Sequence, residues 1–299
     1  MIDGRPRLSV SIPTFNNVDV LRTCIESWRE MAGALPVEVI VVEDGCSDGT
    51  PAFLDEACAT EWGRRRLRWV HEDNVHELRA TNRGLAEARG DVLLAWQDDM
   101  FLRARWLVPE LLATFDAYAD VGLVSLSRGL TCTPCADPIE RWEDLTDWRR
   151  LQSTIGSGPL NWFRLQEVDI VIRPWAVRRA CLERVGALDP IFVPTEWDEA
   201  DLCYRIREAG WKIATYGYER ALAYHHLGST TISKGFSEAY KQRVLRNGLV
   251  FHERWDTIIA RDAPRRRVTW WRRSTPAGWT ATAVRAAGAL ARRLGGARS

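Results

Sequence analysis

The sequence predicts an α/β fold with a mostly parallel central sheet, flanking helices and a C-terminal helical extension. Short β-rich runs alternate with helical patterns through the first half of the chain, which is typical of a parallel sheet covered by helices on both faces. Val37–Val42 is a nearly continuous apolar run, as expected for a strand buried on both sides. The chain of 299 residues is long enough for one large α/β domain or two small ones.

The spacing of apolar residues predicts the individual elements. Between Val18 and Met31 they recur at helical spacing, and Pro51 suits the first turn of a helix that opens at Asp48. We expect strands at Leu8–Thr14, Val37–Val42, Leu67–Val70, Asp91–Trp96, Val121–Ser127, Val168–Ile172, Lys212–Tyr218 and Leu222–His225. Further helices are expected at Glu77–Ala88, Arg105–Tyr118, Trp175–Val185, Asp198–Ala209 and Phe236–Trp255.

The regular alternation breaks from Thr131 to Gln166. This segment contains three prolines, several glycines and three tryptophans, Trp142, Trp148 and Trp162. We interpret it as an irregular insertion with short helices and as a candidate lid.

The charge is distributed unevenly along the chain. Residues 261–299 carry ten arginines and one acid, whereas residues 1–260 carry 31 basic and 39 acidic residues, a net charge of −8. In Arg265–Arg273, tryptophans lie between arginines, which fits the interface of an anionic membrane. A solubilising or disordered tail explains the same composition equally well. No other feature is typical of a nucleic-acid-binding module, so we expect no nucleic-acid partner.

Cysteine usage and hydropathy indicate the compartment. The seven cysteines are scattered, and the N-terminal residues contain no apolar targeting segment, which favours reduced thiols. Cys132 and Cys135 form a single CxxC without a second pair, which we interpret as a loop rather than a zinc site. No apolar run approaches the roughly 20 residues of a membrane span. We therefore expect a cytoplasmic protein, either free or peripheral at the inner face of the cytoplasmic membrane.

The strongest local motif is Trp96-Gln97-Asp98-Asp99, at the end of an apolar strand. Ligands of parallel sheets bind at the carboxyl ends of the strands. Paired carboxylates at such an end suit a hard divalent cation such as Mg²⁺ or Mn²⁺. On spacing alone, a solvated turn is an equally good interpretation, because Asp is common in turns.

Acidic residues also gather at the start of the helix expected at 198–209. Acids in a first turn cap free N–H groups and interact favourably with the helix dipole, which accounts for one or two of them. A spare carboxylate would be available as a general base. The four acids are Glu196, Asp198, Glu199 and Asp201.

Three further segments are candidates for binding. His225 and His226 are adjacent in an expected strand, so at most one faces a given site, where a neutral imidazole would ligate a metal; a histidine in such a place is more often structural. The loop at Pro13–Asn16 and the loop around Asp44 each follow a strand, and a carboxylate there can accept from a base N–H or a ribose hydroxyl. Neither loop has a GxGxxG or Walker pattern.

Taken in order, these segments resemble the family 2 glycosyltransferases of the GT-A fold. The resemblance spans roughly residues 8–230. Val41–Thr50 is close to the signature VVDDGSxDGT, Gln97–Asp99 lies where the family has its DxD, and Asp198–Trp211 resembles EDxDLCxRxxxAGW. Ser9–Asn16, Asn82–Leu85 and Gly186–Asp189 resemble the opening strand, the helix before the DxD and the vGgfD segment.

The resemblance implies a role for each candidate residue. Asp44 would recognise the nucleotide base, in a pocket formed with Pro13, Thr14 and Phe15. Asp98 and Arg79 would contact the nucleotide, the latter through its phosphates. Asp99 would hold Mn²⁺ or Mg²⁺ on the donor diphosphate, with His225 or His226 as a further ligand or phosphate contact.

The chain departs from the family pattern at two places. Gln97 replaces the first Asp of the DxD, so Asp99 would provide most of the direct ligation. The acidic pair reads Asp198-Glu199 instead of Glu-Asp. Alignment on the following Asp201-Leu202-Cys203 places Glu199 at the position of the catalytic base, with Asp198 as the alternative.

The resemblance implies an inverting enzyme that moves a sugar from a nucleoside-diphosphate donor, UDP or dTDP, to an acceptor hydroxyl. We expect the acceptor to be a glycan or a lipid-linked molecule in cell-surface glycan or glycolipid synthesis. Residues 1–255 would form the catalytic domain, with the donor half at 8–127 and the acceptor half at 128–255, followed by the basic tail at 256–299. The alternative is a non-catalytic nucleotide-sugar or glycan-binding protein that retains the fold.

Overall fold

The computed structural model describes residues 5–127, 129–132, 138–146, 151–153, 164–216, 223–228, 237–263 and 270–272. The strands are β1 (Leu8–Thr14), β2 (Val37–Asp44), β3 (Leu67–Glu72), β4 (Val92–Ala95), β5 (Met100–Leu102), β6 (Val121–Ser125), β7 (Gly129–Cys132), β8 (Leu151–Ser153), β9 (Arg164–Glu167), β10 (Ile170–Val171), β11 (Trp175–Arg178), β12 (Lys212–Thr215), β13 (Tyr224–His226) and β14 (Trp270–Arg272). The helices are α1 (Val18–Ala32), α2 (Thr50–Ala59), α3 (Glu61–Arg66), α4 (Glu77–Glu87), α5 (Leu107–Ala117), α6 (Trp142–Thr146), α7 (Arg179–Val185), α8 (Asp198–Glu208) and α11 (Glu238–Asp262), with a short 3-10 helix η2 (Pro190–Phe192).

A nine-stranded sheet forms the centre of the described part of the chain, in the order β14-β9-β12-β6-β11-β4-β1-β2-β3. Strands β3, β2, β1 and β4 are parallel neighbours. Strand β11 is antiparallel to both β4 and β6, and β12 is parallel to β6. Strands β9 and β14 then alternate in direction. Seven of these nine strands therefore run the same way, which confirms the predicted mostly parallel sheet.

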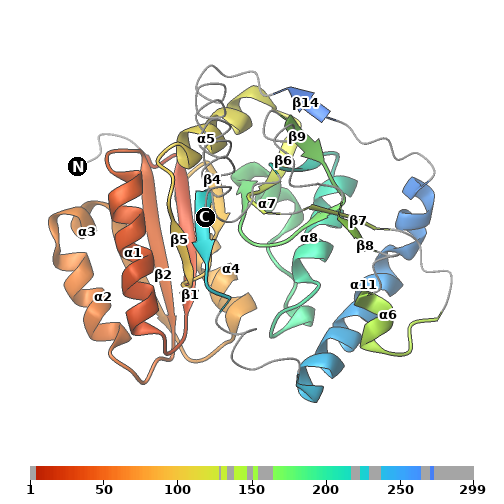
Figure 1. The fold of residues 1–299 in the computed structure, drawn as a ribbon, viewed down its shortest axis with the longest axis horizontal. Helices are drawn as coiled ribbons and strands as arrows, with labels where there is room; N and C mark the ends of the chain where they lie inside the picture. Colours follow the sequence, from red (N-terminus) through yellow and green to blue (C-terminus); the bar gives the residue numbers. More distant parts are fainter. Residues whose placement is uncertain are drawn as a thin grey trace, which may run out of the picture.

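Helices cover both faces of the sheet (Figure 1). Val39 and Val41 of β2 belong to the same buried cluster as apolar residues of α1, α2 and α5. Ile40, which points the opposite way, belongs to a second cluster with residues of α4, α7, α8 and α11. The two clusters on opposite faces explain why β1 and β2 are mostly apolar and are buried throughout.

The helix that we predicted at Trp175–Val185 is wrong in its first four residues. Trp175–Arg178 forms β11, and only Arg179–Val185 is helical. Trp175, Ala176 and Val177 are fully buried because β11 lies inside the sheet between β4 and β6. A short apolar run fits a buried strand and a buried helix equally well, so its periodicity did not distinguish the two.

Three other expectations changed at the level of elements. The insertion at 131–166 contributes β8, α6 and parts of β7 and β9, while Cys135, Trp148 and Trp162 lie outside the described residues. The expected strand at 168–172 is the two-residue β10, which extends a small sheet of order β10-β7-β8. Helix α11 continues to Asp262, and β14 forms the edge of the central sheet. Most of the basic tail, from residue 273 onward, lies outside the described residues.

No helix in the described ranges is long and apolar enough to cross a membrane.

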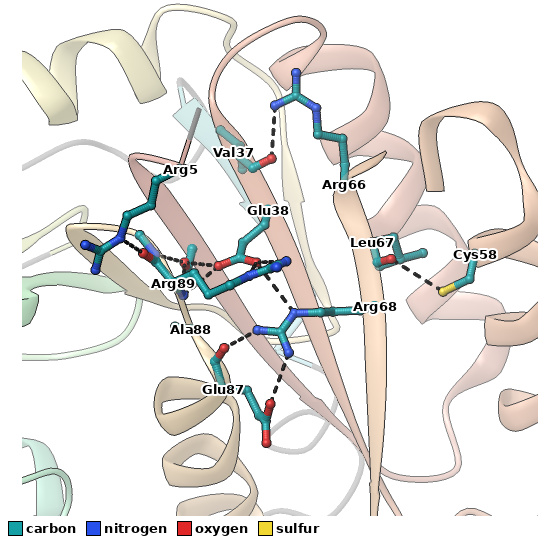
Figure 2. Close-up of polar contacts among 12 residues, drawn as sticks. Arg5, Val37, Glu38, Cys58, Arg66, Leu67, Arg68, Glu87, Ala88 and Arg89 are labelled. Atoms are coloured by element: carbon teal, nitrogen blue, oxygen red, sulfur yellow. Dashed lines mark hydrogen bonds and ion pairs between the residues drawn. The ribbon is translucent and has the colours of Figure 1, made fainter. Parts of the chain in front are cut away.

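A buried carboxylate joins strands at the amino-terminal edge of the sheet (Figure 2). Glu38 of β2 accepts hydrogen bonds from Ser9 Oγ at 2.6 Å and from the backbone N–H of Arg89 at 2.7 Å. The Arg89 guanidinium donates to its other oxygen at 2.9 and 3.0 Å, and Arg68 Nε lies 3.5 Å away. Burial opposes ionisation of Glu38, but the bonds from Ser9 and Arg89 outweigh it and hold its pKa below the ordinary value.

We predict that Glu38→Gln lowers the free energy of unfolding by about 1–3 kcal/mol at neutral pH, because the amide loses charge-assisted bonds and presents N–H groups to donors. Since the folded-state pKa of Glu38 is lowered, its contribution is complete above the unfolded pKa and is lost as pH falls through the folded value. The difference between wild type and variant should therefore shrink in acid. Urea unfolding at neutral pH and at the most acidic pH that keeps the protein folded measures both effects.

Glu26, whose side chain is 44% exposed and forms an ion pair with Arg29 of the same helix, provides the matched control. Glu26→Gln should change the free energy of unfolding by less than about 1 kcal/mol. Equal stability of wild type and Glu38→Gln at neutral pH would contradict the prediction.

Candidate functional site

The carboxyl ends of β1, β2 and β4 meet at one edge of the sheet and bring the first candidate residues together. Thr14 ends β1, and its Oγ1 donates to Asp98 Oδ2 at 2.7 Å. Pro13 is buried one residue earlier, whereas Phe15 is 50% exposed just beyond the strand. Burial raises the pKa of Asp98 to about 6, and the nearby carboxylates of Asp99 and Glu77 add to the effect against the bonds from Thr14 and Asn17.

Asp44 ends β2 and holds a neighbouring loop. Its two carboxylate oxygens accept the backbone N–H groups of Val75, at 2.7 Å, and His76, at 2.9 Å. Asn74 and His76 in this loop have positive φ angles of 55° and 72°, a conformation that is costly for residues other than glycine. Asp44 therefore stabilises the loop before α4. A carboxylate retains further lone pairs, so the expected contact to a base stays a prediction.

A two-stranded sheet brings a histidine to Asp99. Strand β5 follows Asp99 directly and pairs with β13, in a register that sets His226 opposite Met100 and His225 opposite Phe101. His226 Nε2 consequently lies 3.3 Å from Asp99 Oδ1, whereas the ring of His225 lies against Phe101 with centroids 6.0 Å apart. Of the two histidines, the structure brings His226 to Asp99.

Asp99 and His226 fit a divalent metal as a partial set of ligands. Asp99 is 5% exposed, and a carboxylate with an imidazole is a donor pair that Mn²⁺ accepts. The described residues contain no group of three or more His, Cys, Asp or Glu arranged to hold a metal. Such an ion would therefore take its remaining ligands from donor oxygens and water.

A polar network connects the Gln97 loop with the start of α8. Gln97 Nε2 donates to Glu77 Oε1 at 3.3 Å, and Arg173 Nη1 donates to the same oxygen at 2.6 Å. Arg173 also binds Glu199, with Nε 2.9 Å from Oε1 and the backbone N–H 3.1 Å from Oε2. Trp175 Nε1 donates to Glu199 Oε1 at 2.8 Å. Both oxygens of Glu199 are thus held by the segment that leads into β11.

Asp198, the neighbour of Glu199, has a different environment. It is 2% exposed, and its Oδ2 has no hydrogen-bond partner among the described residues. Burial raises the pKa of Asp198 strongly, the charges of Glu199 and Glu77 add to the effect, and Arg173 opposes it. The pair therefore contains one ion-paired carboxylate and one carboxylate with an oxygen that lacks a donor.

The turn before Asp198 sets the position of the acidic pair. Glu196 and Trp197 both have left-handed backbone, with φ of 83° and 67°. Asn247 of α11, which is fully buried, donates its Nδ2 to the carbonyl oxygens of Phe192, Thr195 and Glu196 at 2.8–3.2 Å. Helix α11 therefore stabilises this turn through the side chain of Asn247.

The expected contact of Arg79 with the donor phosphates stays a prediction. Arg79 is exposed on α4, two positions after Glu77, and residues two apart on a helix do not face each other.

Sequence reasoning missed Glu77, Arg173 and Trp175. The signal that could have revealed Arg173 is a single arginine inside the apolar run from Val168 to Val177, where burial requires a partner. The sequence does not show which acid is that partner.

Comparisons with known proteins identify the family of the chain. The family model described as Glycosyl transferase family 2 matches residues 9–162. Putative glycosyltransferase EpsH of Bacillus subtilis is 27% identical over 105 residues, which are 35% of this chain and 28% of EpsH. Glycosyltransferase AglD of Haloferax volcanii is 32% identical over 105 residues, which are 33% of this chain and 16% of AglD. These matches thus span less than a third of either curated relative.

Two solved structures show the same fold at low identity. Mannosyltransferase PcManGT from Pyrobaculum calidifontis, in complex with GDP-Man and Mn²⁺, is 21% identical with a TM-score of 0.50, and the match covers 96% of this chain and 81% of that chain. GalNAc-T7 with UDP, GalNAc and Mn²⁺ is 14% identical with a TM-score of 0.57, and the match covers 85% of this chain and 48% of that chain. With the family model covering more than half of its length, this chain belongs to glycosyl transferase family 2 and has the GT-A fold.

Proposed function

We propose that the protein is a metal-dependent, inverting glycosyltransferase that transfers a sugar from UDP or dTDP to an acceptor hydroxyl. The observation that carries this proposal is the placement of Asp98 and Asp99 at the carboxyl end of β4, with His226 Nε2 3.3 Å from Asp99. Membership of the family and the metal and nucleotides in the names of its structural neighbours support it.

We assign the donor side of the reaction to residues at the carboxyl edge of the sheet. Asp44, Pro13, Thr14 and Phe15 border the end of the sheet where the base and ribose would bind. Mn²⁺ or Mg²⁺, held by Asp99 and His226, would offset the negative charge that develops on the departing diphosphate.

The acceptor side lies across the Glu77–Arg173 network, at the start of α8. The acceptor oxygen would attack the anomeric carbon on the face opposite the diphosphate, and its proton would pass to the acidic pair Asp198–Glu199. Attack on the opposite face inverts the configuration of that carbon.

We predict that Asp99→Ala weakens metal-dependent nucleotide binding at least about tenfold, or about 1.4 kcal/mol. The measurement is calorimetric titration of UDP, dTDP and GDP with and without Mn²⁺. His226→Ala should weaken the same binding. His225→Ala, its neighbour in β13 with a ring against Phe101, is the matched control and should bind like wild type.

If none of the three nucleotides bound, with or without Mn²⁺, the protein would share only its fold with the glycosyltransferases, and the proposed function would be wrong. Binding without donor hydrolysis or transfer would instead identify the non-catalytic nucleotide-sugar-binding protein.

We also propose that the basic tail brings the enzyme to a lipid-linked acceptor at the inner face of the cytoplasmic membrane, for glycan or glycolipid synthesis at the cell surface. The support is compositional: from residue 273 onward, five arginines and no acid follow the described residues.

Full-length protein should co-sediment with vesicles of phosphatidylserine and phosphatidylcholine but not with phosphatidylcholine alone, and added salt should release it. A truncation after Arg272 keeps β14 at the edge of the sheet and should lose the binding. Equal partitioning of the two proteins would remove this role for the tail.

A further inference from the structure

The two carboxylates of the acidic pair differ in what surrounds them. Glu199 accepts three hydrogen bonds, two from Arg173 and one from Trp175 Nε1, at 2.8–3.1 Å. The hydrogen bond that Glu199 accepts from Arg173 Nε is charge-assisted. The side chain of Arg173 is only 7% exposed, so this bond is shielded from water. If Glu199 took a proton, this buried guanidinium would lose one of its two anionic partners, which is costly in such a place.

Arg173 is itself fixed in place from two sides. Nη1 donates to Glu77 Oε1 at 2.6 Å and lies 3.4 Å from Thr81 Oγ1, both on α4, while Nε binds Glu199 on α8. The guanidinium of Arg173 therefore connects α4, through Glu77, with α8, through Glu199. Because the planar guanidinium of Arg173 is bound to both helices, it keeps the Glu199 carboxylate in one orientation.

Asp198 is the carboxylate that remains for proton transfer. Its Oδ2 is the oxygen of the pair that has no partner among the described residues. The charged groups that act on it are Glu199 from its own helix, Glu77 from α4 and Arg173 from the segment before β11. Burial and the two neighbouring carboxylates raise the pKa of Asp198 above that of an ordinary aspartate, which favours its taking up a proton.

We propose that Arg173 is a positioning residue that holds Glu199 as a fixed counter-charge, so that Asp198 is the catalytic base. This inference rests on the glycosyltransferase function proposed above. In the step, the acceptor O–H bond breaks and its proton goes to Asp198 Oδ2. The acceptor oxygen bonds to the anomeric carbon, and the bond from that carbon to the diphosphate breaks with its electron pair on the phosphate oxygen.

Access to Asp198 follows from the turn before it. Because Asp198 is 2% exposed, the proposed step requires a movement that opens a path to Oδ2, and we infer that this movement occurs in the adjoining turn of Thr195, Glu196 and Trp197. This turn carries two consecutive left-handed residues, a conformation held at a cost in free energy.

The first test compares two conservative substitutions. Asp198→Asn should lower kcat by about 100-fold or more, the usual contribution of a general base, while nucleotide binding by calorimetry stays unchanged. Glu199→Gln keeps an oxygen that can accept from Trp175 and Arg173, so its kcat should fall less than about tenfold. A larger loss in Glu199→Gln than in Asp198→Asn would overturn the proposal.

The second test separates positioning from simple loss of structure. Arg173→Met leaves Glu199 charged and without its guanidinium, and kcat should fall at least about tenfold. Adding Glu199→Gln removes that charge, so the double variant should recover most of the lost activity. A double variant as inactive as Arg173→Met would contradict the positioning role, and Arg173→Lys, which keeps the charge, should be intermediate.

Arg65→Met, at an exposed arginine of α3, is the matched control and should leave kcat unchanged. The thermal unfolding midpoint of each variant identifies losses that come from unfolding. A wild-type protein that neither transfers sugar nor hydrolyses the donor refutes the proposed function itself. An active wild type with the reverse ranking of Asp198→Asn and Glu199→Gln refutes only the assignment of the base.

Discussion

The parallel pairing of β1 with both β2 and β4 is the constraint on which the geometry of the site depends. Every residue of these three strands is buried. Each buried Val, Leu or Ile contributes about 1.5–3 kcal/mol. A slip of one residue would exchange the side chains of the two buried faces and would separate Glu38 from Ser9 and Arg89. The register is therefore fixed by packing and by these polar contacts, which lie outside the candidate site. Thr14, Asp44 and Asp98 come together because three strands of fixed register end at the same edge.

Antiparallel additions to this parallel unit complete the site. Strand β13 pairs with β5 and brings His226 to Asp99 across more than a hundred residues of sequence. Strand β11 enters between β4 and β6, and the segment that leads into it carries Arg173 to Glu77 and Glu199. Each pairing positions a polar side chain that the parallel strands do not supply. The site thus combines the carboxyl edge of the parallel strands with two segments that are positioned by the pairing of β13 and β11.

The amino-acid sequence was sufficient to predict most elements of the first half, because strands buried on both faces and amphipathic helices have distinct patterns. The short elements α3 and β5 were not predicted. Their order along the chain predicted the parallel sheet, and strand ends predicted which loops would meet. The choice between His225 and His226 required the register of β13 on β5, which no local pattern states. The strand at Trp175–Arg178 was missed because three buried apolar residues do not distinguish strand from helix.

The acidic pair shows a second limit of prediction from sequence. Motif alignment places Glu199 at the base position, yet the difference between Asp198 and Glu199 arises from Arg173, 26 positions earlier in the chain. A pattern of residue types does not show with which carboxylate an arginine will form an ion pair. That choice depends on the tertiary position of β11, and hence on the part of the chain where the prediction of secondary structure was wrong.

Helix α11 belongs to the site as much as the sheet does. Two consecutive left-handed residues before Asp198 cost about 1–3 kcal/mol each, and the two N–H groups of Asn247 Nδ2, which are shared among three carbonyl oxygens, contribute about 1 kcal/mol each. The hydrogen bonds from α11 therefore offset part of the cost of the turn. Trp197 also packs on Phe251 of the same helix, with centroids 5.0 Å apart. The C-terminal helical extension and Arg173 therefore both act on the acidic pair: the helix helps to set where the pair lies, and the guanidinium, in our proposal, leaves Asp198 as the carboxylate that takes the proton.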